Sequence, residues 1–189
     1  MRDPALYAIV DVETTYGDPR RACVMEVAVI LTDGRRELER WSSLVRPQNG
    51  GPIDPFVSML TGITPAMLSK APRFAEVVTT VQRMTAGSIV VAHNARFDMT
   101  ALGLAFERCG QSFTRDTLCT EQLSRQFFPH LKFHNLNSLC RHMGIPARAD
   151  HRALGDALAC KAALEGVLER FGEDRVLSAM LPAVTRMRA

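Results

Sequence analysis

The chain has 189 residues and a mass of 20.9 kDa, with 47% apolar residues, 23% charged residues and a net charge of +3. This composition is typical of a globular protein with an ordinary core, and it excludes disordered and collagen-like chains. The five cysteines form no CxxC pair and leave one thiol over, so neither a zinc ribbon nor a secreted disulfide framework is indicated. We therefore expect one domain, residues 1–189, in a reducing compartment.

The start of the chain predicts a soluble, cytoplasmic protein. Pro4 and two charged residues fall where a signal peptide needs a basic stretch and then an apolar run. No segment approaches the roughly 20 apolar residues of a membrane span. Residues 1–95 hold 10 basic and 10 acidic side chains, whereas residues 96–189 hold 13 and 10. The segment 108–152 has seven Arg or Lys against three acids, which fits a solvated helical surface or a nucleic-acid partner equally well.

Three strands are predicted at the start of the chain. Apolar runs cover residues 6–12 and 22–31, and the second ends at the turn dipeptide Asp33-Gly34. Residues 38–45 follow after this short connection. Short connections predict an antiparallel three-stranded meander. Residues 47–55 are rich in Pro and Gly and predict a loop.

Strands and helices then alternate. Strands are predicted at residues 88–92 and 113–118, and helices after Pro72 and at residues 95–109, 120–128, 135–143 and 151–171. The last helix places one stripe of side chains at Leu154, Ala157, Leu158, Lys161, Glu165 and Leu168. Strands first, then alternating strands and helices, predict an α/β fold with a mixed sheet flanked by helices.

The first candidate site is the pair Asp11 and Glu13. In a strand, side chains two residues apart share a face, so the two carboxylates project together while Val10 and Val12 face the core. Adjacent carboxylates repel unless a cation lies between them, and oxygen ligands suit Mg²⁺ or Mn²⁺. A solvent-facing acid pair is the alternative, because a triplet of this kind also arises by chance.

The second candidate segment, Val91–Asp98, runs from a buried strand into the start of a helix. Asp98 lies in the first helical turn, where the helix dipole favours an anion. Asn94 has an ordinary role as N-cap, and Phe97 as a core residue. These structural roles stay open beside a functional one.

The third candidate segment contains His151 and Asp156. Asp156 falls on or beside the apolar stripe of its helix, where an unpaired carboxylate is costly. A buried salt bridge to an arginine and a bound metal are the two explanations. His151, just before the helix, is either a capping or surface imidazole or a functional group.

The order Asp-x-Glu, Asp, His-x4-Asp resembles that of the DEDDh exonucleases, the DnaQ-like branch of the ribonuclease H superfamily. The resemblance covers about residues 5–171 and includes two further segments, Ile53–Leu68 and Asp116–Leu118. It implies a ribonuclease H-like mixed sheet in residues 5–171, followed by a short C-terminal helical extension at residues 172–189.

The resemblance implies a two-metal exonuclease that removes nucleotides from 3′ ends. Asp11, Glu13 and Asp156 would hold one Mg²⁺ or Mn²⁺ ion, and Asp11 with Asp98 the second. His151 would be the general base, since imidazole titrates near neutral pH.

Substrate contacts are also implied by the resemblance. Thr14 and Thr15 would face the terminal nucleotide, Leu60 and Thr61 would pack against its base, and Asn94 and Phe97 would support the site. Tyr16 departs from the family, which often has Gly there, and it is either a base-stacking residue or an exposed turn residue.

The leading hypothesis is a DNA exonuclease of the polymerase III proofreading type or a repair exonuclease. Its substrate would be a single-stranded or frayed DNA 3′ end, and its partner a polymerase or another replication or repair protein. Two alternatives stay open. One is an exoribonuclease of the same superfamily, since discrimination depends on how the pocket treats the 2′-OH. The other is a non-catalytic nucleic-acid-binding or assembly module.

Overall fold

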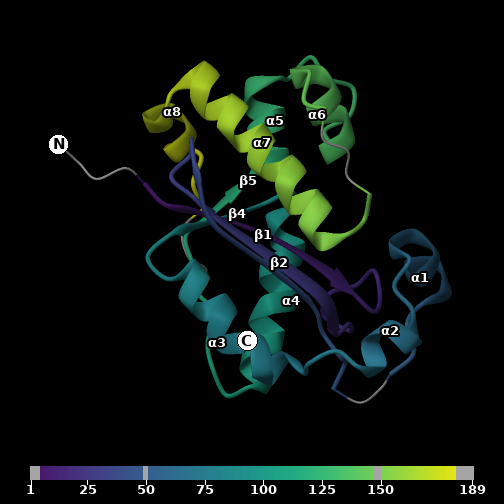
Figure 1. The fold of residues 1–189 in the computed structure, drawn as a ribbon. Helices are drawn as coiled ribbons and strands as arrows, with labels where there is room; N and C mark the ends of the chain where they lie inside the picture. Colours follow the sequence, from purple (N-terminus) through teal and green to yellow (C-terminus); the bar gives the residue numbers. More distant parts are fainter. Residues whose placement is uncertain (1–4, 49–50, 147–149, 182–189) are drawn as a thin grey trace.

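The fold is built around a five-stranded mixed sheet, seen in a computed structural model that describes residues 5–48, 51–146 and 150–181 (Figure 1). The strands lie in the order β3-β2-β1-β4-β5. Their bounds are β1 (Tyr7–Thr14), β2 (Val24–Thr32), β3 (Glu37–Leu44), β4 (Ile89–Ala92) and β5 (Thr117–Cys119). The pairs β1–β2 and β2–β3 are antiparallel, whereas β4 is parallel to β1 and β5 to β4. The predicted α/β fold with a three-stranded meander and added parallel strands is confirmed.

Three strand predictions were wrong at their ends, because β1 ends at Thr14 and not at residue 12, β2 begins at Val24 and not at residue 22, and β5 begins later than predicted. β1 continues to Thr14 because β2 stays paired with it as far as Val24, well beyond the end of the β1–β4 pairing at Ile9. β5 begins at Thr117 and not at Phe113, because the Phe113 ring packs 4.7 Å from the Phe106 ring, between centroids. The chain before Thr117 therefore connects a helix to the sheet, and the carbonyl of Asp116 already accepts the Val90 N–H of β4 at 2.9 Å.

Helices cover both faces of the sheet (Figure 1). Their bounds are α1 (Pro55–Thr61), α2 (Pro65–Ser69), α3 (Phe74–Thr85), α4 (Ala95–Arg108), α5 (Thr120–Phe127), α6 (Leu136–Met143), α7 (Ala153–Phe171) and α8 (Glu173–Leu177). The helices α3 and α4 lie on one face, and α5 to α8 lie on the other, with α7 packed along β1 and β2. The helices α1 and α2 lie beside the end of β1 (Figure 1).

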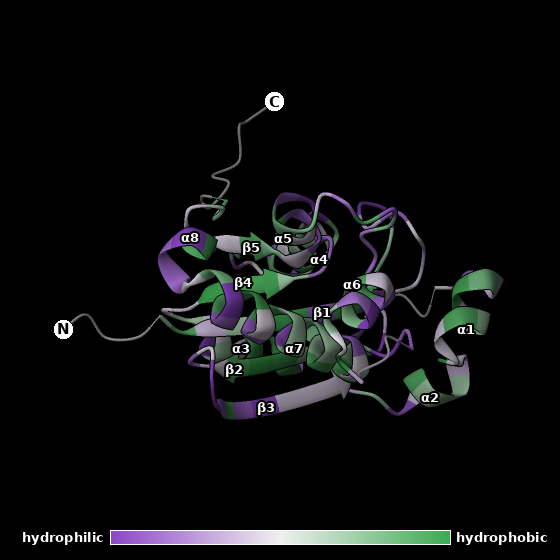
Figure 2. Cartoon of the chain, turned by 90° about the horizontal axis from the view of Figure 1, so that it is seen from above, coloured by the Kyte–Doolittle hydropathy of each residue, from purple (hydrophilic) through white to green (hydrophobic). Residues whose placement is uncertain are grey.

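The alternation of side chains along β1 divides the core into two layers. Val10 and Val12 pack against α3 and α4, whereas Tyr7 and Ile9 pack against α7. Because side chains two residues apart share a face, Asp11 and Glu13 lie on the α7 face. The strands β2 and β4 are largely hydrophobic, whereas the edge strand β3 is mostly polar (Figure 2).

The predicted last helix is confirmed in place but corrected in its start and its buried face. It begins at Ala153, two residues later than predicted. Its buried residues are Ala153, Asp156, Ala157, Ala159, Cys160, Ala163, Leu164 and Val167. The predicted stripe members Lys161 and Glu165 instead form a salt bridge of 2.9 Å outside the buried face. Small residues face the sheet because they let the helix approach it closely, and the buried stripe includes Asp156.

The end of the described chain forms the short helix α8, which lies within the predicted helical extension. The hydroxyl of Tyr7 donates a hydrogen bond of 2.8 Å to Glu173 at its start. Residues 182–189 of the predicted extension lie outside the described residues. Within the described ranges, every helix is too short or too polar to cross a bilayer.

Candidate active site

The Asp11–Glu13 pair lies at the end of β1 where only one neighbouring strand is present. β4 stops pairing with β1 at Ile9, whereas β2 remains paired alongside both acids. The backbone of β1 is therefore open on its β4 side beyond Ile9. Both carboxylates project from the α7 face near this open end, as the sequence predicted.

Asp98 fills the open side of β1. It lies in the first turn of α4, is 3% exposed, and accepts a hydrogen bond of 3.1 Å from the backbone N–H of Val12. Asn94 stands at the N-cap position, but its φ of 63° is left-handed and its side chain makes no capping bond. The predicted capping role is therefore wrong for the Asn94 side chain. The exposed amide stays available to a ligand, while Phe97 is partly buried against the α3–α4 layer.

Asp156 and His151 come from the start of α7. Asp156 is 8% exposed and accepts a hydrogen bond of 2.9 Å from the backbone N–H of Asp150. His151 is exposed, and its φ of 59° places it in the left-handed region. Among the described residues, no arginine or lysine forms a salt bridge with Asp156. The salt-bridge explanation for its burial is therefore not supported within the described residues.

The pKa of each of the four carboxylates is raised. Burial is the largest cause for each, and the charge of Asp156 adds to it for the other three. The pKa of Glu13 rises to about 8, even though the Arg152 guanidinium opposes the rise. The pKa of Asp11 is also raised, and so is that of Asp98. The pKa of Asp156 is raised by burial, against the Asp150 N–H and the charge of His151.

This donor set fits a divalent cation. Glu13, His151 and Asp156 each offer one ligand atom, and these three atoms lie within 4.8 Å of one another. Crowded carboxylates with raised pKa values are stabilised in their charged form by a cation between them. Carboxylate oxygens favour a hard ion such as Mg²⁺ or Mn²⁺. The chain therefore contains a candidate acidic metal-binding cluster, which we call the acid cluster: Asp11, Glu13, Asp98 and Asp156.

A fifth acid next to this cluster was missed by the sequence analysis. Glu26 on β2 lies opposite Glu13 and is 5% exposed. Its carboxylate accepts hydrogen bonds from Arg152 Nε at 3.1 Å, Arg152 Nη2 at 2.7 Å and the backbone N–H of Ala153 at 2.9 Å. Glu26 thereby fixes the start of α7 against β2. The available signal was an acid inside an otherwise apolar strand, at the level of Glu13.

The expected substrate residues surround the end of β1, but their side chains differ in availability. Thr14 Oγ1 donates to the carbonyl of Tyr16 at 2.7 Å, and Thr15 Oγ1 accepts from the N–H of Cys23 at 3.0 Å. Both hydroxyls therefore shape the chain after β1. Tyr16 is 36% exposed in the turn that follows.

Leu60 and Thr61 lie on α1, which a backbone bond holds beside β1. The N–H of Asp54 donates to the carbonyl of Thr15 at 2.9 Å, one residue before α1 begins. Leu60 is 40% exposed, whereas Thr61 is buried and bonds to the carbonyl of Val57. Leu60 is thus free to contact a ligand, and Thr61 supports it from within α1.

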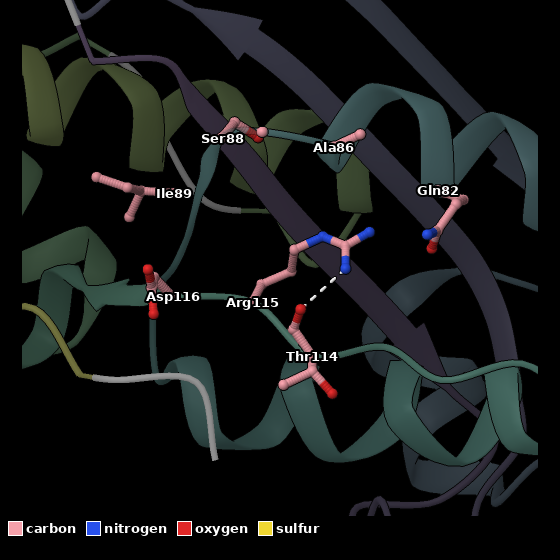
Figure 3. A pocket seen from close by; sticks show the side chains of 8 residues that line it. Gln82, Ala86, Ser88, Ile89, Thr114, Arg115 and Asp116 are labelled. Atoms are coloured by element: carbon pink, nitrogen blue, oxygen red, sulfur yellow. Dashed lines mark hydrogen bonds between the residues drawn. The ribbon is translucent and has the colours of Figure 1, made fainter. Parts of the chain in front are cut away.

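A cavity of about 550 Å³ lies away from the candidate site residues, where α3 ends and β4 and β5 begin (Figure 3). Arg115 enters it, but its Nε donates to the carbonyl of Thr85 at 3.1 Å and its Nη1 to that of Thr114 at 2.9 Å. Arg115 therefore satisfies a carbonyl in the last turn of α3. We assign this cavity a structural role.

The comparisons with known proteins agree with the fold and with the order of the motifs. The profile of the RNase_T exonuclease family matches residues 8–164. The DNA polymerase III subunit epsilon of Aquifex aeolicus is 32% identical over 90% of this chain and 86% of its own length. The DNA polymerase III PolC-type of Bacillus cereus is 34% identical over 81% of this chain, which spans only 11% of that relative.

Solved structures show the same fold. Exonuclease X, in complex with 5′ overhanging duplex DNA, matches with a TM-score of 0.73 and 26% identity over 92% of this chain and 98% of that chain. Exonuclease I of E. coli, in complex with a dT13 oligonucleotide, matches with a TM-score of 0.79 and 19% identity over 92% of this chain and 43% of that chain. The predicted resemblance is confirmed: this chain belongs to the exonuclease family.

Proposed function

We propose that this chain is a metal-dependent 3′→5′ exonuclease that releases nucleoside monophosphates from DNA. The observation that carries the proposal is the acid cluster, four carboxylates gathered from β1, α4 and α7 with His151 beside two of them. We propose Asp11, Glu13, Asp98 and Asp156 as ligands of two Mg²⁺ or Mn²⁺ ions. Bound divalent ions would activate the attacking water and stabilise negative charge on the phosphate oxygens.

The residues of the chain supply base catalysis and positioning. His151 is exposed and lies within reach of Glu13 and Asp156, so its imidazole can accept the proton of a water held beside these carboxylates. Leu60 and Asn94 present exposed side chains for the terminal nucleotide. Thr14, Thr15, Thr61 and Phe97 hold the surrounding backbone in place. The attacking water adds to the phosphate of the terminal nucleotide, and the 3′ oxygen of the preceding nucleotide leaves.

DNA is the proposed substrate for two reasons. Two relatives that match this chain over most of their own length are named as subunits of a DNA polymerase, and the structure of Exonuclease X contains DNA. By the same argument, we propose a polymerase or another replication or repair protein as a partner. A single-stranded or frayed 3′ end is preferred, since the terminal base has to leave the helical stack before it enters the site.

The test of this proposal incubates purified protein with end-labelled substrates. These are single-stranded DNA, duplex DNA with a mismatched 3′ end, and RNA of the same sequence, each in Mn²⁺ or in EDTA. We expect mononucleotide release from DNA in Mn²⁺, none in EDTA, and none from the Asp11→Ala variant even with added metal. Undiminished turnover in EDTA would exclude the metal-dependent mechanism. Faster turnover of RNA would support an exoribonuclease, and binding without hydrolysis a non-catalytic module.

A further inference from the structure

A second cavity, of about 140 Å³, lies where the chain leaving β3 meets the start of α3 and the end of α4. Each of these three segments contributes one arginine to its wall: Arg46, Arg73 and Arg108. The half-buried Cys23 and Cys109 also line it. We call this site the arginine groove.

Within the described part of the chain, the three guanidinium groups have no carboxylate partner in a salt bridge. Among the described residues, the Arg46 guanidinium donates through Nη1 to the carbonyl of Ser69 at 3.3 Å, and its Nε is buried without a hydrogen-bond partner. Arg108 donates to the carbonyl of Ala22 at 3.3 Å and contacts Cys23 Sγ at 3.7 Å.

The start of α3 adds to the positive potential of the groove. α3 has 12 residues and begins next to Arg73, so the positive end of its dipole points toward the groove. One acid is close by: the Glu76 carboxylate accepts the backbone N–H of Arg73 at 2.8 Å, which caps the helix. The remaining charge of the wall is positive, which favours an anionic ligand.

The groove lies at the same end of the sheet as the acid cluster. Thr15, two residues beyond Glu13, bonds to Cys23 in both directions, through its N–H at 2.9 Å and its hydroxyl at 3.0 Å. On the other side, Arg46 bonds to Ser69 at the end of α2, the helix that follows α1. The segment Thr15–Cys23 therefore links the end of β1, which carries the acid cluster, to the wall of the groove.

We propose that the arginine groove binds phosphate groups of the substrate strand upstream of its 3′ end. This proposal rests on the proposed function. Guanidinium groups match phosphate oxygens in geometry and charge, and such contacts hold a strand without reading its sequence. Typical small-molecule sites have volumes of about 300 Å³ or more, and this cavity is smaller. It therefore accommodates a phosphate group and not a whole nucleotide.

The test compares two double variants that each remove two positive charges. R73A/R108A changes the groove, whereas R35A/R36A changes the exposed turn between β2 and β3, at the opposite end of the sheet. Arg46 is retained because its Nε is buried. Affinity for a long oligothymidylate is measured in Ca²⁺ at several salt concentrations. Each lost phosphate contact lowers the salt slope by about 0.7 for a single strand, so R73A/R108A should lose about 1.4 and R35A/R36A nothing.

Two further measurements separate the groove from the chemistry. The p-nitrophenyl ester of thymidine 5′-monophosphate reaches only the acid cluster, so R73A/R108A should hydrolyse it at the wild-type rate. Absence of ester and DNA hydrolysis by the wild type would overturn the proposed function, whereas the salt slope tests the groove in either case. Equal salt slopes for the two double variants would overturn the groove.

The two cysteines of the groove provide an independent probe. Saturating oligothymidylate should slow alkylation of Cys23 and Cys109 by iodoacetamide, measured by mass spectrometry in Ca²⁺. The same oligonucleotide should protect neither thiol in R73A/R108A at a concentration that saturates the wild type. Unchanged alkylation of both cysteines in the saturated wild type would contradict the proposal.

Discussion

Within the described part of the chain, Asn94 and His151 alone among non-glycine residues have a positive φ, 63° and 59°. Asn94 stands immediately before α4, which carries the buried Asp98. His151 stands two residues before α7, which carries the buried Asp156. Left-handed backbone is costly for residues other than glycine, and such conformations concentrate at functional sites. The two strained residues therefore flank the acid cluster and leave their side chains exposed.

His151 is the residue whose removal separates base catalysis from metal and substrate binding. We expect His151→Ala to lower kcat by roughly 10² to 10⁴, the usual contribution of a general base, while affinity for DNA in Ca²⁺ is unchanged. The loss should shrink at high pH, where hydroxide replaces the base. The measurement is kcat against pH at saturating Mn²⁺, with His142→Ala, an exposed histidine on α6, as the control. Equal kcat for His151→Ala and wild type at every pH would remove His151 from the mechanism.

The acid cluster should make the metal-free protein less stable as pH rises. The pKa of Glu13 is about 8 in the folded chain, and those of Asp11, Asp98 and Asp156 are raised as well. Between about pH 4 and pH 8 the folded state therefore binds more protons than the unfolded state, so the free energy of unfolding falls as pH rises.

The check is the melting temperature in EDTA from pH 5 to pH 8.5. Asp98→Asn should flatten this dependence and raise the melting temperature at pH 8, because the amide oxygen still accepts the Val12 N–H without a charge. Added Mn²⁺ should flatten the dependence for the wild type. A melting temperature that rises with pH in EDTA would show that the carboxylates are stabilised by the fold itself.

At the scale of elements, the site depends on how α7 is fastened to the sheet. Glu26 on β2 accepts three hydrogen bonds from Arg152 and Ala153, and Gly155 leaves room for Asp150 in the first turn. A Cβ at Gly155 would lie 2.6 Å from Asp150 Oδ1, too close for an ordinary contact. The start of α7, and with it His151 and Asp156, is therefore fixed by contacts outside the acid cluster.

Glu26→Gln tests this fastening. Loss of the charge weakens hydrogen bonds of a kind that contributes roughly 1.5 to 3 kcal/mol, so unfolding should be easier in urea by about 2 kcal/mol. The kcat should fall because His151 and Asp156 lose their positions. The control is Glu37→Gln, whose partner Arg40 is exposed on β3, so its expected cost is below about 1 kcal/mol with unchanged kcat. Equal effects of the two substitutions would leave Glu26 without a positioning role.

At the scale of the whole molecule, the open end of β1 gathers parts that are distant in sequence. β1, α4 and α7 bring the acids, α1 lies beside the end of β1, and the arginine groove lies on the other face at the same end. A site at one end of a sheet, with α1 projecting beside it, is suited to receive the free end of a strand (Figure 1).

The polarity of cleavage is a prediction of the proposed function. Linear single-stranded DNA should be shortened from its 3′ end, whereas circular single-stranded DNA and DNA with a blocked 3′ end should stay intact. Gel electrophoresis of labelled linear and circular forms in Mn²⁺ measures this difference. Nicking of the circular form would show that the site accepts an internal phosphodiester.

Sequence patterns predicted the three-stranded meander, the helices from α3 to α7 and the candidate acids Asp11, Glu13 and Asp156, whereas Asp98 entered the proposed cluster through the family resemblance. Alternation in β1 placed Asp11 and Glu13 on one face, and the burial of Asp156 within an apolar helix marked it as unusual. These inferences succeed because side-chain periodicity is a local property of strands and helices.

Only the tertiary structure decided how the site is held together. The Glu26–Arg152 pair joins residues 126 positions apart, and the Asp98–Val12 bond spans 86, so no local pattern contains them. The arginine groove likewise combines three segments that meet only when α3 and α4 pack on the sheet. The buried face of α7 depended on which residues fit closely against β1 and β2, because a close approach of the helix to the sheet requires small side chains. The hydrophobic pattern of the sequence does not record the distance between the helix and the sheet.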